Sequence, residues 1–267
     1  MRAEVRQAGR DSWSGSVFLW DERGLFLGQA SGTSSHAPHA VKICLAAHGS
    51  FRLRRGADAA WRECRAALVP PDEPHQIDGR GARLALFYLL PETPEGQQVL
   101  RSFSGTTAAA AAQGALSKLS RRVKSYLDHG CDGEEAADLC DEMVFSLTAS
   151  AAPCAGLDGR VAQALAYLRS ALDRRVTSEE IAQAVSLSPS RIAHLFREQA
   201  GLPLRRYVLW LRLCAALDRM ALSDSLTDAA HAAGFADSAH LSRTFRRMHG
   251  ITPSALLQHS RFFHGAK

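Results

Sequence analysis

The sequence predicts a mixed α+β fold, with a small β-barrel first, connector helices in the middle and an all-helical domain at the carboxyl end. Three observations predict it. Short apolar runs separated by Gly, Pro and Asp fill residues 13–90, apolar residues recur every three or four positions after Pro94, and helix caps followed by glycines recur from Arg160 onward. We therefore expect a barrel over 1–93, a helical connector over 94–150, a linker over 151–158 and a helical domain over 159–267.

The barrel is predicted from strand-sized segments with turn residues between them. The apolar runs 17–20 and 25–27 flank Asp-Glu-Arg-Gly, which predicts a hairpin with Gly24 at a position of positive φ. Many short strands at this spacing favour a small barrel or a sandwich. Further strands are expected over 39–45, 51–54, 61–69 and 83–90.

The connector is predicted to contain two amphipathic helices, over 115–128 and 134–149. The sequence leaves open whether these helices pair with a second subunit or pack on the barrel. Residues 150–159 (SAAPCAGLDG) then have the composition of a linker. From Arg160 onward we expect only helices, and we expect seven short ones.

The composition excludes several classes of protein. A hydrophobic content of 46% with 22% charged residues argues against a largely disordered chain. The longest uncharged stretch in the middle of the chain, 102–117, is too short and too weakly apolar to span a bilayer, and no signal peptide is visible. The six cysteines form no Cys-x-x-Cys pair. We therefore expect a cytoplasmic globular protein with no membrane partner.

Positive charge is concentrated in the helical domain. Residues 158–267 carry 15 Lys and Arg against 9 Asp and Glu, whereas residues 1–157 carry 17 against 18. A basic domain joined to a near-neutral one favours a polyanion as the partner of the basic part, because phosphate neutralisation releases counterions.

The helical domain contains an internal repeat. Capping-box patterns at 177–180 and 225–228 each open a short Ala-rich helix, which is followed by a tight turn and a second helix. Gly201 and Gly250 close the second helices, each five residues beyond a Phe. Two short helices joined by such a turn describe a helix-turn-helix, and residues 204–221 form a helix that connects the two copies.

The period of an α-helix predicts which residues of the two second helices face outward. Arg243 is the strongest candidate for a bidentate contact to guanine, which discriminates by about 1–3 kcal/mol. Phosphate contacts position the protein without specifying sequence. The predicted base contacts are Ser190, Ala193, His194, Ser238, Ala239, His240 and Arg243, and the predicted phosphate contacts are Arg197, Arg246 and Arg247.

The second copy resembles the signature of the AraC/XylS family of transcription regulators. The segment concerned is Gly-Phe-Ala-Asp-Ser-Ala-His-Leu-Ser-Arg-Thr-Phe-Arg-Arg-Met-His-Gly-Ile-Thr-Pro, residues 234–253. Residues 187–201, with Tyr207 and Arg212, are similar to the first helix-turn-helix of the family. The resemblance covers about 100 residues. Where the family usually has an aromatic residue and Arg after the Thr-Pro turn, this chain has two leucines, residues 256–257.

The resemblance implies a sequence-specific regulator, an activator by family habit, that is controlled by a small-molecule effector in a cupin-like barrel. It also implies that both recognition helices enter successive major grooves of double-stranded DNA, over an asymmetric site of about 20 bp. A homodimer and contact with RNA polymerase are expected by the same analogy.

Three histidines of the barrel are candidate site residues. A metal-binding cupin usually has two His two residues apart with a carboxylate soon after, but His36 and His39 are spaced by three and Lys42 stands nearby instead. We therefore expect no metal, no cofactor and no enzyme activity, and an effector pocket lined by His39, Ile43 and His75. The alternative is a cupin-type metal-dependent enzyme or metal sensor fused to a DNA-binding domain, with His36, His39 and His75 as ligands.

Overall fold

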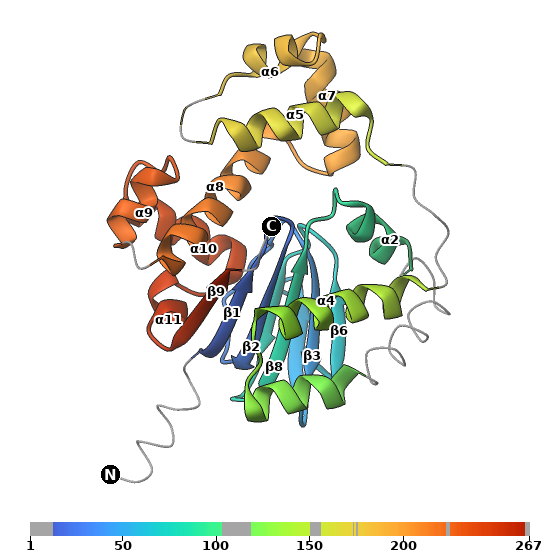
Figure 1. Cartoon of the computed structure of the whole chain (residues 1–267), viewed down its shortest axis with the longest axis vertical. Coiled ribbons are helices and arrows are strands. Elements are labelled where there is room, and N and C mark those ends of the chain that lie inside the picture. Colours follow the sequence, from blue (N-terminus) through green and yellow to red (C-terminus); the bar gives the residue numbers. More distant parts are fainter. Residues whose placement is uncertain are drawn as a thin grey trace. The chain divides into compact units, whose positions relative to one another are not determined.

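The chain forms two compact units. The structure, a computed structural model, describes residues 13–102, 119–149, 156–172, 174, 176–222 and 225–264. The first unit comprises 1–154 together with 245–267, and the second comprises 155–244. The mixed α+β class is confirmed, with sheets in the amino-terminal part and helices in the carboxy-terminal part (Figure 1). Within the described ranges, no helix has the length and apolarity needed to cross a membrane.

The larger sheet of the first unit has six strands in the order β6-β3-β8-β2-β1-β9. Neighbouring strands are antiparallel, except that β1 and β9 run parallel. The predicted hairpin forms, but Gly24 has no positive φ, because it pairs with Leu19 as part of the ladder. The strands are β1 (Ser14–Leu19), β2 (Arg23–Gln29), β3 (Val41–Ala46), β6 (Ala66–Val69), β8 (Arg83–Leu89) and β9 (Ser260–His264).

The smaller sheet has the order β5-β4-β7. Only two isolated bridges among the described residues, Gly32 to Asp78 and His36 to His75, link segments outside these ladders. The expectation of a closed barrel is therefore wrong: the edge strands of the larger sheet, β6 and β9, do not pair with each other, and the sheets form an open sandwich. The strands are β4 (Phe51–Arg55), β5 (Arg62–Cys64) and β7 (His75–Asp78).

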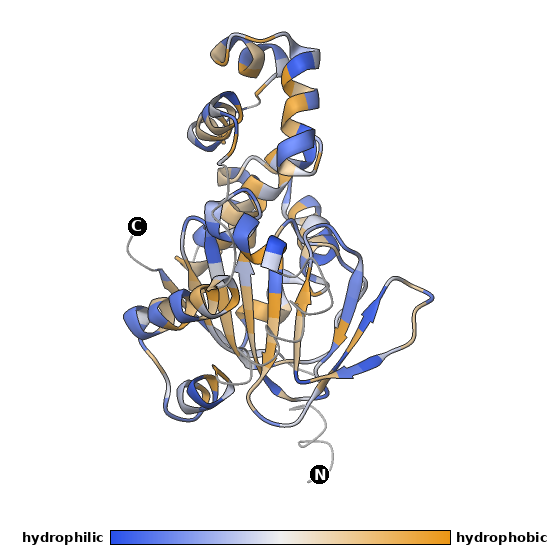
Figure 2. Cartoon of the chain, turned by 90° about the vertical axis from the view of Figure 1, so that its right-hand side faces the viewer, coloured by the Kyte–Doolittle hydropathy of each residue, from blue (hydrophilic) through white to orange (hydrophobic). Residues whose placement is uncertain are grey.

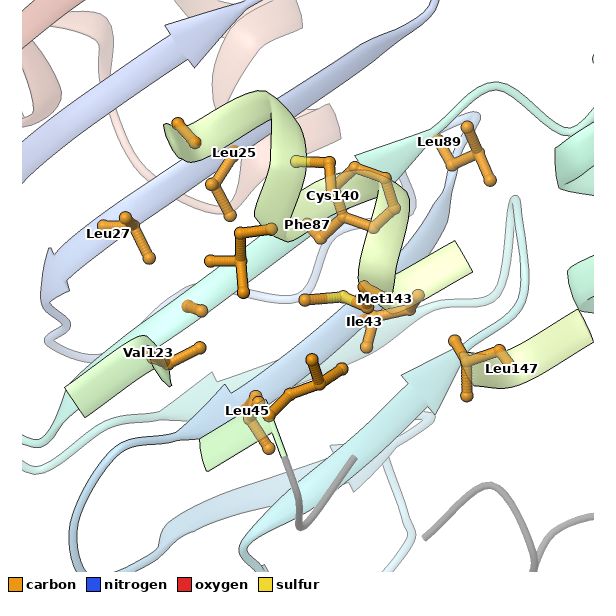
Figure 3. Packing of buried hydrophobic residues seen from close by; sticks show 14 of the residues in the cluster. Leu25, Leu27, Ile43, Leu45, Phe87, Leu89, Val123, Cys140, Met143 and Leu147 are labelled. Carbon is orange, nitrogen blue, oxygen red and sulfur yellow. The ribbon is translucent and has the colours of Figure 1, made fainter. Parts of the chain in front are cut away.

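Helices cover one face of the larger sheet, and β3 is therefore buried on both faces. Alternate residues of β3 pack in two different cores. Val41, Ile43 and Leu45 pack in the core with the helices, whereas Cys44 packs with residues of the smaller sheet. Figure 3 shows the side chains of α4 directed at those of the sheet. The covering helices are α2 (Pro94–Ser102), residues 119–129 and α4 (Gly133–Thr148).

The apolar residues of α4 recur at three- and four-residue steps, which makes one face of the helix a core face. Asp132 and Glu135 form a reciprocal capping box at its start. Its bounds agree with the prediction to within one residue, while residues 115–118 of the other connector helix lie outside the described residues. Figure 2 shows the larger sheet coloured mostly as hydrophobic and the helices as mixed.

The second unit is built from helices with side-chain caps. Thr177, Ser188 and Ser225 each accept a hydrogen bond from the backbone N–H three residues on, as the capping patterns predict. The elements are α5 (Gly159–Ser170), α6 (Ser178–Ala184), α7 (Pro189–Ala200), α8 (Leu204–Ala221), α9 (Leu226–Ala232) and α10 (Ser238–His249), and α10 continues into the residues of the first unit.

The chain after His249 departs from the expectation of helices throughout. Helix α11 (Pro253–Leu257) is followed by β9, which adds a parallel strand to β1. Phe263 of β9 stacks on Phe18 of β1 with ring centroids 4.8 Å apart. Residues 245–264 therefore pack with the sheets, whereas the sequence assigns all of 159–267 to a single domain.

Candidate nucleic-acid interface and histidine cluster

The outward face of α7 consists of the residues that the helix period assigns to it. Ser190, Ala193, His194 and Arg197 are exposed. The opposite side carries Ile192, Leu195, Phe196 and Ala200, all buried in the core of the second unit. Arg191 is also exposed and lies in the first turn, where a side chain reaches past the end of the helix. The sequence prediction omitted Arg191 because it was limited to the stripe opposite the core.

The outward face of α10 follows the same rule. Ala239, Arg243, Arg246 and Arg247 are exposed, and Ser238 is half-buried. Buried Leu241, Thr244, Phe245 and Met248 form the other side. All three arginines therefore lie on one continuous exposed surface of a single helix, which is the arrangement expected for contact with a polyanion.

His240 is more constrained than the prediction assumed. Its backbone N–H donates to the Oδ1 atom of Asp237 over 2.6 Å, which makes Asp237 the cap of α10. Its ring meets the ring of Phe235 edge-on, with centroids 5.2 Å apart. A ring held this way has fewer rotamers than that of the exposed His194.

Arg212 of α8 links the two helix pairs of the second unit. Its guanidinium donates to the carbonyl oxygen of Arg174, ahead of α6, over 3.2 Å. The same guanidinium lies against Gly234, in the turn between α9 and α10, where a Cβ atom would be 3.0 Å from its Nε. Gly234 has φ of 74°, so this turn requires glycine for both its backbone angle and its space. Arg212 of the connecting helix therefore joins the segment ahead of α6 to the turn between α9 and α10.

In the first unit, two of the predicted histidines meet at a buried lysine. The Nδ1 atoms of His36 and His75 donate to the carbonyl oxygens of Ser34 and Glu73, over 2.9 and 2.8 Å. This arrangement leaves both Nε2 atoms as acceptors. Lys42 Nζ donates to them over 3.1 and 3.3 Å.

The surroundings of Lys42 are apolar or neutral. The Nζ atom lies 5.3 Å from the ring centroid of Tyr88, and that ring meets His249 edge-on. Burial lowers the pKa of Lys42 to about 8. Burial and the Lys42 charge lower the pKa of His75 and of His249 to about 3, and they lower that of His36 further. At neutral pH the cluster therefore holds one ammonium among neutral imidazoles.

The other two predicted pocket residues lie elsewhere. The Nδ1 atom of His39 binds the carboxylate of Asp72 over 2.8 Å, and its Nε2 faces Glu92 at 3.7 Å. Ile43 packs under the helices. The structure thus brings His36 and His75 together but separates them from His39, and no group of three or more His, Cys, Asp or Glu among the described residues is placed to hold a metal ion. Lys42 Nζ occupies the point on which the two Nε2 atoms converge.

Comparison with known proteins identifies the helical part. Residues 181–259 match the family described as "Helix-turn-helix domain". The transcriptional activator RhaS of Citrobacter koseri is 38% identical over 102 residues, which are 38% of this chain and 37% of that protein. The chain carries an AraC-type DNA-binding domain. The resemblance deduced from residues 234–253 is thereby confirmed.

Two further comparisons extend beyond this AraC-type domain. The transcriptional activator NphR of Rhodococcus is 26% identical over 227 residues, covering 79% of this chain and 68% of that one. The crystal structure of an apo ToxT variant from Vibrio cholerae superposes with a TM-score of 0.60 at 13% identity, covering 90% of this chain and 98% of that one, so the likeness is one of fold. The chain matches little more than a third of the length of the RhaS proteins of Citrobacter koseri, Klebsiella pneumoniae and Enterobacter.

Proposed function

We propose that the protein is a sequence-specific DNA-binding regulator, an activator of transcription, whose DNA affinity is controlled by a small molecule bound to the first unit. The observation that carries the proposal is the agreement between the family match and the surfaces of α7 and α10. Within residues 181–259, the side chains facing away from the core of each helix are exposed and include His194 in one and Arg243 in the other.

Each outward residue has a role set by its chemistry. Arg243 reads guanine through a bidentate pair of hydrogen bonds, and His194 reads a base edge on the first helix. Arg197, Arg246 and Arg247 bind phosphates. They lie nearer the carboxyl ends of their helices, and from there their side chains reach the DNA backbone rather than the floor of the groove. Ser190, Ala193, Ser238, Ala239 and His240 complete the base-contacting surfaces, so that α6–α7 and α9–α10 act as two helix-turn-helix motifs.

Regulation by a small molecule is supported by the fold. A ToxT structure of similar fold, at 11% identity and a TM-score of 0.52, contains a bound unsaturated fatty acid. In the present chain the sandwich of the first unit is the counterpart of a cupin-like effector domain. Activation is proposed by analogy with RhaS and NphR, which are named as transcriptional activators. A homodimer and contact with RNA polymerase are proposed by analogy with the AraC/XylS family.

Selection of binding sites from random duplex DNA tests the function. We expect the full chain to enrich an asymmetric site of about 20 bp, because two recognition helices one helical turn (~34 Å) apart read it. In repeated selections, His194→Ala should lose sequence preference in one half of the site and Arg243→Ala in the other. Arg169→Ala, an exposed arginine on α5, is the matched control.

Two outcomes of this selection would contradict the proposal. Enrichment of no sequence by the wild-type chain, under conditions in which it is folded, excludes sequence-specific binding. Loss in the same half of the site for both variants would show that α7 and α10 do not read separate segments.

A further inference from the structure

The first unit has an open groove that shares no lining residue with the Lys42 cluster. It has a volume of about 460 Å³ and is formed by the β1–β2 turn, the end of β8, α2 and α4. This volume is within the range of 300–1,000 Å³ typical of small-molecule sites. Four separate elements meet there, so a molecule in the groove touches the sheet and both helices at once.

The wall of the groove is apolar and contains two aromatic rings. Trp20, Leu89, Val144 and Phe145 contribute side chains to it. Phe145 is 72% exposed, although its helix buries its opposite face in the core. When a ligand covers an aromatic ring exposed to this degree, the binding is favoured, because apolar surface is removed from water.

The charge of the lining is strongly negative. Asp21, Glu22, Glu95 and Asp141 line the groove together with one cation, Arg23. Four carboxylates against one guanidinium leave a formal excess of three negative charges. A concave surface lined by one sign of charge concentrates ions of the opposite sign, so the groove attracts cations and repels anions.

The chain itself already places a cation in this environment. The Arg23 guanidinium lies 5.2 Å from the ring centroid of Trp20 and forms an ion pair with Asp141 of α4. A positive group over an aromatic face beside a carboxylate is the arrangement by which proteins recognise organic cations. Phe145 lies one helical turn beyond Asp141 on the same helix and offers a second ring.

We propose that this groove binds a small organic cation with an apolar body, of the arylalkylammonium class, and that this molecule is an effector of the DNA-binding unit. The ammonium faces the carboxylates of Glu95 and Asp21, and the apolar body covers Phe145 and the partly buried Val144. The regulatory half of this inference rests on the proposed function, whereas the binding half stands on the groove alone.

Calorimetric titration of the full chain tests the binding half. The probes are benzyltrimethylammonium, benzyl alcohol and phenylacetate, which share a ring and differ in charge. We expect the cation to bind at least tenfold more tightly than the neutral alcohol, and phenylacetate not to bind. A cation–π contact contributes about 0.5–2 kcal/mol, so Phe145→Leu should weaken cation binding by roughly two- to thirtyfold.

Matched variants locate the site. Glu95→Gln should weaken binding of the cation and leave that of benzyl alcohol unchanged, because only the charge is removed. Glu134→Gln, at an exposed carboxylate of α4 outside the groove, should change neither. Equal affinity for all three probes, or unchanged cation affinity in both Phe145→Leu and Glu95→Gln, overturns the proposal.

Two more measurements distinguish this proposal from a dimer interface in the groove and from a ligand that does not regulate DNA binding. If sedimentation shows a dimer that Phe145→Asp converts to a monomer, the groove is an interface between copies and the ligand proposal is wrong. If the cation binds but changes the affinity for a selected DNA site by less than twofold, it is no effector and the regulatory half is wrong. Failure to select any DNA site contradicts the proposed function while leaving cation binding intact.

Discussion

Lys42 holds two histidine rings with their Nε2 atoms directed at one point. Its ammonium donates to both Nε2 atoms, and each Nδ1 is fixed by a backbone carbonyl. A buried charge is tolerated when hydrogen bonds and an aromatic face replace its water. The sequence analysis noted Lys42 only as standing where a carboxylate is expected, whereas the structure buries it because both faces of β3 are covered.

The cluster predicts how the stability of the first unit depends on pH. His36, His75 and His249 are neutral when folded, with pKa values below the ordinary 6.5, so the unfolded chain binds more protons in acid. Their contribution to stability is complete above about pH 6.5 and is lost as the pH falls toward 3. Within that window, each histidine lowers the free energy of unfolding as the pH falls.

Urea unfolding between pH 4 and 7, followed by tryptophan fluorescence, measures this dependence. His75→Asn should flatten the slope, whereas His231→Asn, at an exposed position, should not. A wild-type stability that stays constant from pH 7 to pH 4 would show that these histidines are not buried in neutral form.

Two glycines that end corresponding helices differ in what surrounds them. Gly201 and Gly250 have φ of 79° and 78°, as the sequence predicts for C-terminal glycines. A Cβ atom on Gly201 meets nothing, whereas one on Gly250 lies 2.6 Å from His36 Nδ1 and 2.7 Å from Thr33 Cβ. Gly201→Ala should therefore cost about 1 kcal/mol from backbone strain, and Gly250→Ala clearly more. Denaturation midpoints of the two variants compare them, and equal losses would contradict the contact with His36.

At the scale of elements, residue periodicity predicted the helices α7 and α10 well and the strands of the sheets less well. The buried and exposed faces of α7 and α10 follow from residue spacing alone, because each helix needs one apolar stripe. The strands β7 and β9 escaped prediction. The first is a four-residue strand beside a proline, and the second owes its structure to pairing with β1, more than 240 residues away.

Within α10, the arginines should separate by the kind of DNA contact. Arg246→Ala removes a phosphate contact, so affinity should fall for every sequence and the slope of log K against log salt should decrease by about one. Arg243→Ala should weaken binding to the selected site far more than to random DNA. Fluorescence anisotropy at several salt concentrations distinguishes the two. An unchanged salt slope in Arg246→Ala would exclude it as a phosphate contact.

At the scale of the whole molecule, composition predicted only one of the two points at which the chain passes between the units. The linker at 150–159 and the basic excess after Leu157 predicted one boundary, and the first unit gives way to the second between residues 154 and 155, within that linker. Nothing in the sequence predicted the second boundary, after Thr244. It arises from contacts such as the hydrogen bonds from Ser34 and Ala37 to the carbonyls of Gly250 and Arg247, which join segments distant in sequence.

The last strand offers a test of that second boundary. Ending the chain after Gln258 removes β9, its ladder with β1 and the stack of Phe263 on Phe18, while the helices α5 to α11 stay. We expect the first unit to lose stability, and Phe263→Ala alone to cost about 1.5–3 kcal/mol, because a large apolar side chain leaves the sheet. Arg261→Ala, exposed on the same strand, is the control and should cost less than about 0.5 kcal/mol. Urea denaturation of the three variants, followed by the fluorescence of Trp13 and Trp20, measures the losses. A truncated chain as stable as the full one would mean that β9 does not pair with β1 in solution, and that residues 259–264 belong to neither unit.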